Sequence, residues 1–175
     1  MGQGTDASRR DDLYLKASAE FGPALDRLAR AYEADPSQRL DLLQDIHFAL
    51  WRSFSGFAEQ CSLRTWVYRV AHNVGISRRV RRRRSQPISL EDMDQLPAAE
   101  STPEENVHSI QVLARLHALI RALKPPDGQV MLLYLEDMDA GAIGEITGLS
   151  ARAVATRIHR IKALLARNFR QGELP

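Results

Sequence analysis

The 175-residue chain has little of several features that define large classes of proteins. It contains one cysteine, Cys61, so no disulfide can form within the chain. Its longest uninterrupted apolar run, Val130–Leu135, has six residues, which is far too short to span a bilayer. The first ten residues hold no apolar segment of the kind found in a secretory signal, so the expected location is the cytoplasm.

Strand signals and catalytic motifs are also scarce. Few residues are β-branched and no stretch alternates cleanly between polar and apolar, which favours an all-α fold. The chain has no Gly-x-x-x-x-Gly-Lys loop, no His-Glu-x-x-His sequence and no cysteine pair with metal-ligand spacing. Its five histidines are scattered. We therefore expect no enzyme activity, no metal, no cofactor and no small-molecule substrate.

The small net charge of +2 conceals four blocks of opposite sign. Residues 1–63 carry a net charge of −3, residues 64–84 hold 8 arginines and no acid, residues 85–105 hold 6 acids and no base, and residues 106–175 carry +3. Within the last block, residues 150–171 contain six bases and no acid. This pattern indicates two contacts with a polyanion, joined by a self-repelling tether. For either basic segment alone, an ordinary solvated surface is the alternative.

Apolar residues recur at helical spacing along most of the chain. The spacing predicts helices over 13–32, 40–54, 63–84, 104–123, 129–136, 140–147 and 151–169. Three prolines and few large apolar residues between Ser85 and Pro103 predict a linker. We therefore expect two small helical domains, over 11–84 and 106–171, joined by a flexible acidic linker over 85–105.

The stretch Asp139–Arg170 has the pattern of a helix-turn-helix. Asp139 and Ser150 are suited to cap the two helices, and Gly148 can take the positive φ that a tight turn requires. Gly144 falls where the two helices must approach closely. A short αα-hairpin with the same caps is the alternative.

Two strings resemble those of a known family. Asp41–Ile46 (Asp-Leu-Leu-Gln-Asp-Ile) resembles the clamp-binding motif of bacterial RNA polymerase sigma factors of the extracytoplasmic-function type, group IV. Thr65–Asn73 (Thr-Trp-Val-Tyr-Arg-Val-Ala-His-Asn) resembles the signature of the DNA-melting helix in that family. The resemblance extends from Phe21 to Phe169 and implies a region 2-like bundle followed by a region 4-like helix-turn-helix. It also implies a protein that binds core RNA polymerase at its clamp and flap, recognises −10 and −35 promoter elements, helps to melt the promoter, and directs transcription of a stress or envelope-response regulon.

The resemblance carries over to individual residues of this chain. The implied contacts with the polymerase clamp are Asp41, Leu42, Gln44 and Asp45. The implied contacts with −10 DNA are Phe57, Arg64, Trp66, Arg69, Asn73, Arg78, Arg79 and Arg81. The implied contacts with −35 DNA are Ser150, Arg152, Ala153, Thr156, Arg157, His159, Arg160 and Lys162.

Two of these residues are candidates for holding an extruded base, because an aromatic ring can stack on a base and an amide can pair with its edge. They are Phe57 and Asn73. Core packing for Phe57, and a cap or bend for Asn73, are the alternatives.

Three further questions stay open at the level of sequence. One alternative function is a helix-turn-helix regulator that never joins polymerase. It would explain residues 139–170 but neither Asp41–Ile46 nor Thr65–Asn73. Another is a helical interaction module without DNA binding, which would not explain the two basic segments. The acidic linker either follows the template-strand path in polymerase or is a plain tether. The resemblance also implies an anti-sigma partner, which no residue of the chain reveals.

Overall fold

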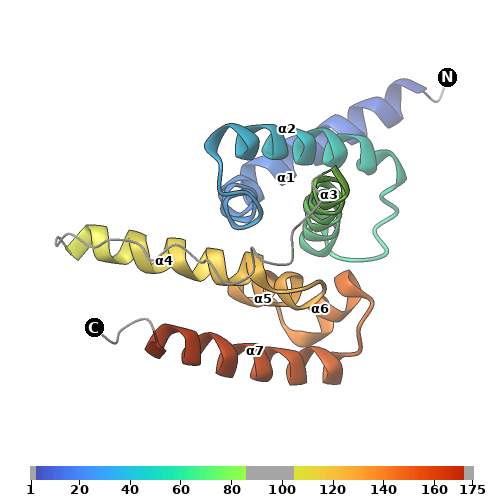
Figure 1. Cartoon of the computed structure of the whole chain (residues 1–175). Helices are drawn as coiled ribbons and strands as arrows, with labels where there is room; N and C mark the ends of the chain where they lie inside the picture. The colour runs from blue at the N-terminus through green and yellow to red at the C-terminus, as the bar shows by residue number, and fades with distance from the viewer. Residues whose placement is uncertain (1–2, 86–104, 172–175) are drawn as a thin grey trace.

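The computed structural model describes residues 3–85 and 105–171 (Figure 1). All regular structure in these two ranges is helical, which confirms the expected all-α fold. The elements are α1 (Gln3–Tyr32), α2 (Pro36–Ser53), the 3₁₀ turn η1 (Phe54–Gly56), α3 (Leu63–Ser85), α4 (Glu105–Ala122), α5 (Asp127–Leu135), α6 (Ala140–Thr147) and α7 (Ala151–Gln171). None of the described helices is long and apolar enough to cross a lipid bilayer.

The first three helices pack against one another in the upper half of Figure 1. Each contributes an apolar stripe at helical spacing, and these stripes meet in a common core. Its buried members include Leu25 and Leu28 of α1, Leu42, Ile46 and Leu50 of α2, and Val67 and Ala71 of α3.

The last four helices form the second half, with α5 and α6 packed against the long α7. Val154 and Ile161 of α7 are buried against this pair, and Leu133 of α5 and Ile143 of α6 are fully buried beside them. The order of the helices along the chain matches the two small helical units that the sequence predicts. The predicted acidic linker lies outside the described residues except at its two ends.

The two halves are in contact. α3 packs against α6, and α1 packs against α4. One apolar cluster includes Leu25 of α1 and Val67 of α3 together with Ile143 of α6, and a second joins Ala31 of α1 to Ile120 of α4. Hydrophobicity patterns within each half do not predict this docking.

Most helix ends lie within two residues of the ends expected from the sequence, but the first residues of α1 and α2 do not. α1 begins at Gln3 rather than near Leu13, so the helix is ten residues longer than its apolar stripe. α2 begins at Pro36 rather than Leu40, because Asp35 caps it by accepting a hydrogen bond of 2.8 Å from the main-chain nitrogen of Gln38. Proline is favoured at such a first helical position.

Candidate functional site

The outer face of α2 carries the acidic residues predicted to contact polymerase. The side chains of Asp41 and Asp45 are 59% and 51% exposed, and Gln44 is also exposed. Positions 41 and 45 lie one turn apart, so both carboxylates project from the same side of the helix. Leu42 is buried in the core, so its side chain is not part of this face.

Arg78 of α3 lies against this acidic face. Its guanidinium is 3.0 Å from the carboxylate of Asp45 and 3.6 Å from that of Asp41, and it donates a 2.7 Å hydrogen bond to Gln38. In this arrangement Arg78, predicted to contact DNA, is bonded to the helix predicted to contact polymerase.

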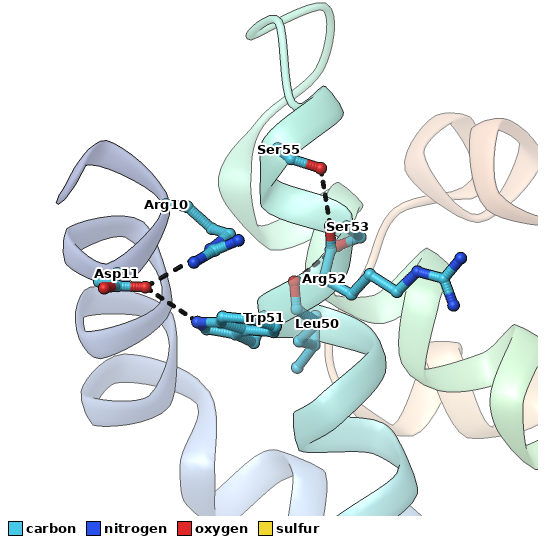
Figure 2. A network of polar contacts seen from close by, with 7 residues as sticks. All are labelled: Arg10, Asp11, Leu50, Trp51, Arg52, Ser53 and Ser55. Atoms are coloured by element: carbon cyan, nitrogen blue, oxygen red, sulfur yellow. Dashed lines mark hydrogen bonds and ion pairs between the residues drawn. The ribbon is translucent and has the colours of Figure 1, made fainter. Parts of the chain in front are cut away.

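An apolar patch adjoins the acidic face and was not anticipated from the sequence. Leu40 is 69% exposed and Phe48 62% exposed, and the ring of Phe48 stacks on that of Trp51. Figure 2 shows the contacts between α1 and Trp51. The indole nitrogen of Trp51 donates to Asp11 at 2.9 Å, and the guanidinium of Arg10 lies 3.7 Å from the centroid of the Trp51 ring. The spacing of Leu40, Phe48 and Trp51 places them on one side of α2. This spacing is the signal in the sequence from which the patch could have been predicted.

The loop predicted to hold an extruded base is closed over its aromatic residue. Phe57 is 7% exposed, and its ring packs against Phe54 and Trp66 with centroids 6.1 Å and 5.2 Å away. The indole nitrogen of Trp66 donates to Ser53 at 2.9 Å. Asn73 of α3 is exposed. Phe57 is therefore a core residue in this arrangement, while Asn73 lies on the surface.

Three arginines of α3 predicted to contact DNA reach across to the second half of the molecule. Each donates to a main-chain carbonyl oxygen, an acceptor that competes with phosphate for the same guanidinium. The pairs are Arg64 with Glu136, Arg69 with Glu145 at 3.1 Å, and Arg79 with Leu123 at 2.8 Å. Arg81 lies exposed further along α3.

The side chain of Glu136, just after α5, also binds the first half. Arg27 of α1 donates to both of its carboxylate oxygens, at 2.8 and 2.6 Å, and the hydroxyl of Tyr68 donates at 2.9 Å. Glu136 is only 13% exposed. Burial and the nearby carboxylate raise the pKa of Tyr68, so the phenol stays protonated and able to donate. Glu136 thus connects α1 and α3 to the end of α5.

The buried His72 of α3 belongs to the core and not to a site. Its Nδ1 lies 2.8 Å from the hydroxyl of Tyr32. Complete burial lowers the pKa of His72 to about 3, so the ring is neutral near pH 7. Among the described residues, no three His, Cys, Asp or Glu side chains are grouped as a metal site would require.

The predicted helix-turn-helix is formed by α6, a tight turn and α7. Asp139 and the Ser150 hydroxyl each accept from the main-chain nitrogen three residues further on, at 2.9 and 3.2 Å. Gly148 has φ 76°, the left-handed conformation that its place after α6 requires. A Cβ at Gly144 would lie 2.6 Å from the carbonyl oxygen of Leu149, so the turn crosses α6 where only glycine fits.

α7 presents the residues predicted to contact −35 DNA. Its apolar side, with Val154 and Ile161 fully buried, packs on the rest of the domain. The predicted residues Ser150, Arg152, Thr156, His159, Arg160 and Lys162 are exposed, whereas Ala153 and Arg157 are half-buried. Asp127, the first residue of α5, accepts from both Arg157 and Arg160.

Comparison with known proteins identifies these two halves. The family described as Sigma-70 region 2 matches residues 19–85, and Sigma-70, region 4 matches residues 113–165. The chain belongs to the sigma-70 family. The two matches cover more than half of the chain, and the sigma-70 region 2 match is not expected of a helix-turn-helix regulator that acts without polymerase, so that alternative is not favoured.

Relatives place the protein in the extracytoplasmic-function group of the sigma-70 family. It is 29% identical over 137 residues to "ECF RNA polymerase sigma factor SigE" of Mycolicibacterium smegmatis, a match that covers 77% of this chain and 52% of that protein. It is 26% identical over 155 residues to "ECF RNA polymerase sigma factor SigW" of Bacillus subtilis, with 82% and 79% covered. The chain thus spans about half the length of SigE and most of SigW. These matches confirm the family expected from the two strings.

A solved structure has the same fold. CnrH in complex with the cytosolic domain of CnrY superimposes with a TM-score of 0.68, covering 96% of this chain and 94% of that chain. The sequences are 21% identical, so the likeness concerns the fold of this sigma-70 family member.

Proposed function

We propose that this sigma-70 family protein binds core RNA polymerase, recognises the −10 and −35 elements of its promoters, helps to melt them and directs transcription initiation. It acts in the cytoplasm, carries out no bond chemistry itself and needs no cofactor. One observation above all supports the proposal: a single chain combines an exposed acidic and apolar face on α2 with a basic helix-turn-helix at α6 and α7.

The α2 face is suited to a basic protein partner. Asp41 and Asp45 offer carboxylates for charge-assisted hydrogen bonds, and Gln44 adds an amide. The exposed Leu40 and Phe48 add apolar area that water covers in the free chain. An interface with apolar anchors and charged neighbours is typical of specific protein association. We assign this face to the polymerase clamp.

The exposed side of α7 is suited to DNA. Arg152 and Thr156 lie in its first two turns, the part of a recognition helix that reaches base edges in the major groove. His159 and Lys162 lie further along, where phosphates pass. We assign this side to the −35 element.

Recognition of the −10 element requires the first half to change its contacts. Arg64, Arg69 and Arg79 are bonded to carbonyl oxygens of the second half, and Phe57 is packed in the core. Contact of these residues with melted DNA therefore needs the two halves to separate and the loop around Phe57 to open. We propose that the described arrangement is the unbound, closed form of the protein.

A protein inhibitor is the remaining partner in the proposal. CnrH, which shares the fold, is in complex with the cytosolic domain of CnrY. A partner that binds this chain in a similar way would act as an anti-sigma factor if it kept the two halves closed.

The assignment of α2 is tested by Asp45→Arg. The substitution puts a positive charge where the proposed partner is basic, and we expect the affinity for core RNA polymerase to fall about tenfold or more, as when a charged interface pair becomes repulsive. Binding is measured by fluorescence anisotropy of the labelled chain, and initiation by transcription from a promoter mapped after overexpression.

Asp45→Arg also breaks the ion pair with Arg78, so Arg78→Gln is the matched control. It breaks the same pair but leaves the α2 face acidic, and core binding should persist. Undiminished binding by Asp45→Arg would refute the α2 assignment, and a wild-type chain that binds DNA but not core would refute the proposed function.

A further inference from the structure

Asp127 makes contacts that no sequence motif accounts for. It is the first residue of α5 and its side chain is 18% exposed. One carboxylate oxygen lies 2.6 Å from the guanidinium of Arg157, and the other lies 2.6 Å from that of Arg160. A single negative charge is therefore shared by two positive charges of the recognition helix.

The packing of α5 on α7 fixes this arrangement. Met131 and Leu132 of α5 lie in one buried cluster with Ile161 and Leu165 of α7, and Ile161 directly follows Arg160 in the chain. Arg157 and Arg160 are three residues apart and so neighbour each other on the helix surface. Because both helices are anchored, the carboxylate lies within reach of both guanidiniums without ordering a loop. The side chain of Arg157 is 33% exposed and that of Arg160 is 66% exposed.

The negative charge of Asp127 acts on the basic segment of residues 150–171. Residues 150–171 contain six bases and no acid, so the segment itself supplies no negative charge. Asp127 supplies one from α5 and engages a third of those six bases. A phosphate that approaches Arg157 or Arg160 must compete with this carboxylate for the guanidinium donors and is also repelled by it.

We propose that Asp127 is a specificity-determining residue of the recognition helix, an inference that rests on the proposed binding of −35 DNA by α7. Phosphate contacts supply nearly all non-specific affinity for DNA and carry no sequence information. By holding Arg157 and Arg160, Asp127 weakens most the complexes that depend on phosphate contacts alone, which are those with non-specific duplexes. A duplex whose base edges are also bound loses a smaller share of its contacts, so the ratio of specific to non-specific affinity rises.

The test is Asp127→Asn in the full chain, with folding checked by circular dichroism. The first probe is a fluorescent 20-base-pair duplex of mixed sequence, titrated at several KCl concentrations. We expect binding to this duplex to tighten about threefold to tenfold as two guanidiniums are released. The slope of log K against log salt should steepen by about 0.9 to 1.8, the value for one or two added phosphate contacts. The second probe is a pool of randomised duplexes, in which the variant should enrich its preferred sequence less than the wild type does.

Glu145→Gln is the matched control, because it removes one exposed negative charge from the same half of the molecule without touching these arginines. It should change neither the slope nor the enrichment. In a chain that also carries Arg157→Gln and Arg160→Gln, Asp127→Asn should have no further effect. A role of Asp127 confined to folding would not produce this dependence on the two arginines.

The outcomes separate the two proposals. If the wild type enriches a sequence and Asp127→Asn enriches it equally with an unchanged salt slope, the role of Asp127 is refuted and the function stands. If the wild type enriches no sequence at all, recognition of the −35 element is refuted, and the role of Asp127 is refuted with it.

Discussion

At the scale of the residue, the helix-turn-helix depends on one glycine. A Cβ built at Gly144 would lie 2.6 Å from the carbonyl oxygen of Leu149, and a main-chain oxygen cannot move aside as the end of a side chain can. We expect Gly144→Ala to lower the free energy of unfolding by about 1–3 kcal/mol, the usual cost of overpacking a tight contact. Thermal unfolding followed by circular dichroism measures the change.

Gly22→Ala is the control for that substitution. Gly22 lies within α1, and a Cβ there would meet nothing within 4 Å. Alanine has the better helix propensity, but the ring of Pro23 disfavours a Cβ on the helical residue before it, so we expect the free energy of unfolding to change little. If both variants melt like the wild type, the close approach at Gly144 does not constrain the turn.

Residues with local roles were predictable, and residues whose role depends on tertiary packing were not. Asp139, Gly148 and Ser150 act through main-chain groups at most four residues away, so the sequence alone indicated their roles, and the structure confirms them. The burial of Leu42 and Phe57 depends on helices and loops distant in sequence. No pattern within their own segments distinguishes a buried side chain there from an exposed one that binds a partner.

At the scale of the element, α6 is short and depends on its cap. It has only eight residues, and the Asp139 carboxylate accepts from the main-chain nitrogen of Ala142 at 2.9 Å. We expect Asp139→Ala to cost about 1 kcal/mol of stability in urea unfolding, because that nitrogen loses its partner. Asp139→Asn keeps an acceptor and should stay close to the wild type; an equal loss from both substitutions would show that the carboxylate acts in some other way.

The length of α1 shows why the ends of a helix are harder to predict than its presence. Its first ten residues carry almost no apolar side chains, so hydrophobic periodicity begins near Leu13. In the structure, contacts with distant residues accompany this first part: Arg9 pairs with Glu59, and Asp11 accepts from Trp51. Contacts across 40 or 50 residues leave no periodic signal in the segment that they hold.

At the scale of the whole molecule, the α3 arginines that we propose to contact DNA have other partners in the second half. Their clustering in α3 is typical of a nucleic-acid contact, and that pattern says nothing of the carbonyl oxygens they bind in the closed form. Glu136, which binds Arg27 and Tyr68, was one acid among many in the sequence. Two domains were predictable because each has its own helical pattern. Their docking was not, because it joins residues of α1 and α3 to residues more than 40 positions away.

Removal of the Glu136 carboxylate should shift the molecule toward an open form. Glu136→Ala leaves Arg27 and Tyr68 without their shared acceptor, and charge-assisted hydrogen bonds of this kind each contribute about 1–3 kcal/mol. The apolar contacts between the halves remain, so we expect a mixture of closed and open molecules. A compact chain of this length has a radius of gyration of about 16 Å, and small-angle scattering should give a clearly larger average for the variant.

Glu145→Ala is the matched control, because Glu145 contributes a main-chain oxygen to Arg69 while its own side chain is exposed. It should leave the radius of gyration unchanged. If opening is what frees Arg64 and Arg69 for DNA, Glu136→Ala should also bind a single-stranded oligonucleotide more tightly at low salt, and this gain should disappear as salt screens the phosphates. A variant as compact as the wild type would mean that the apolar contacts alone hold the halves together, and binding of polymerase would then have to overcome those contacts rather than the polar contacts of Glu136.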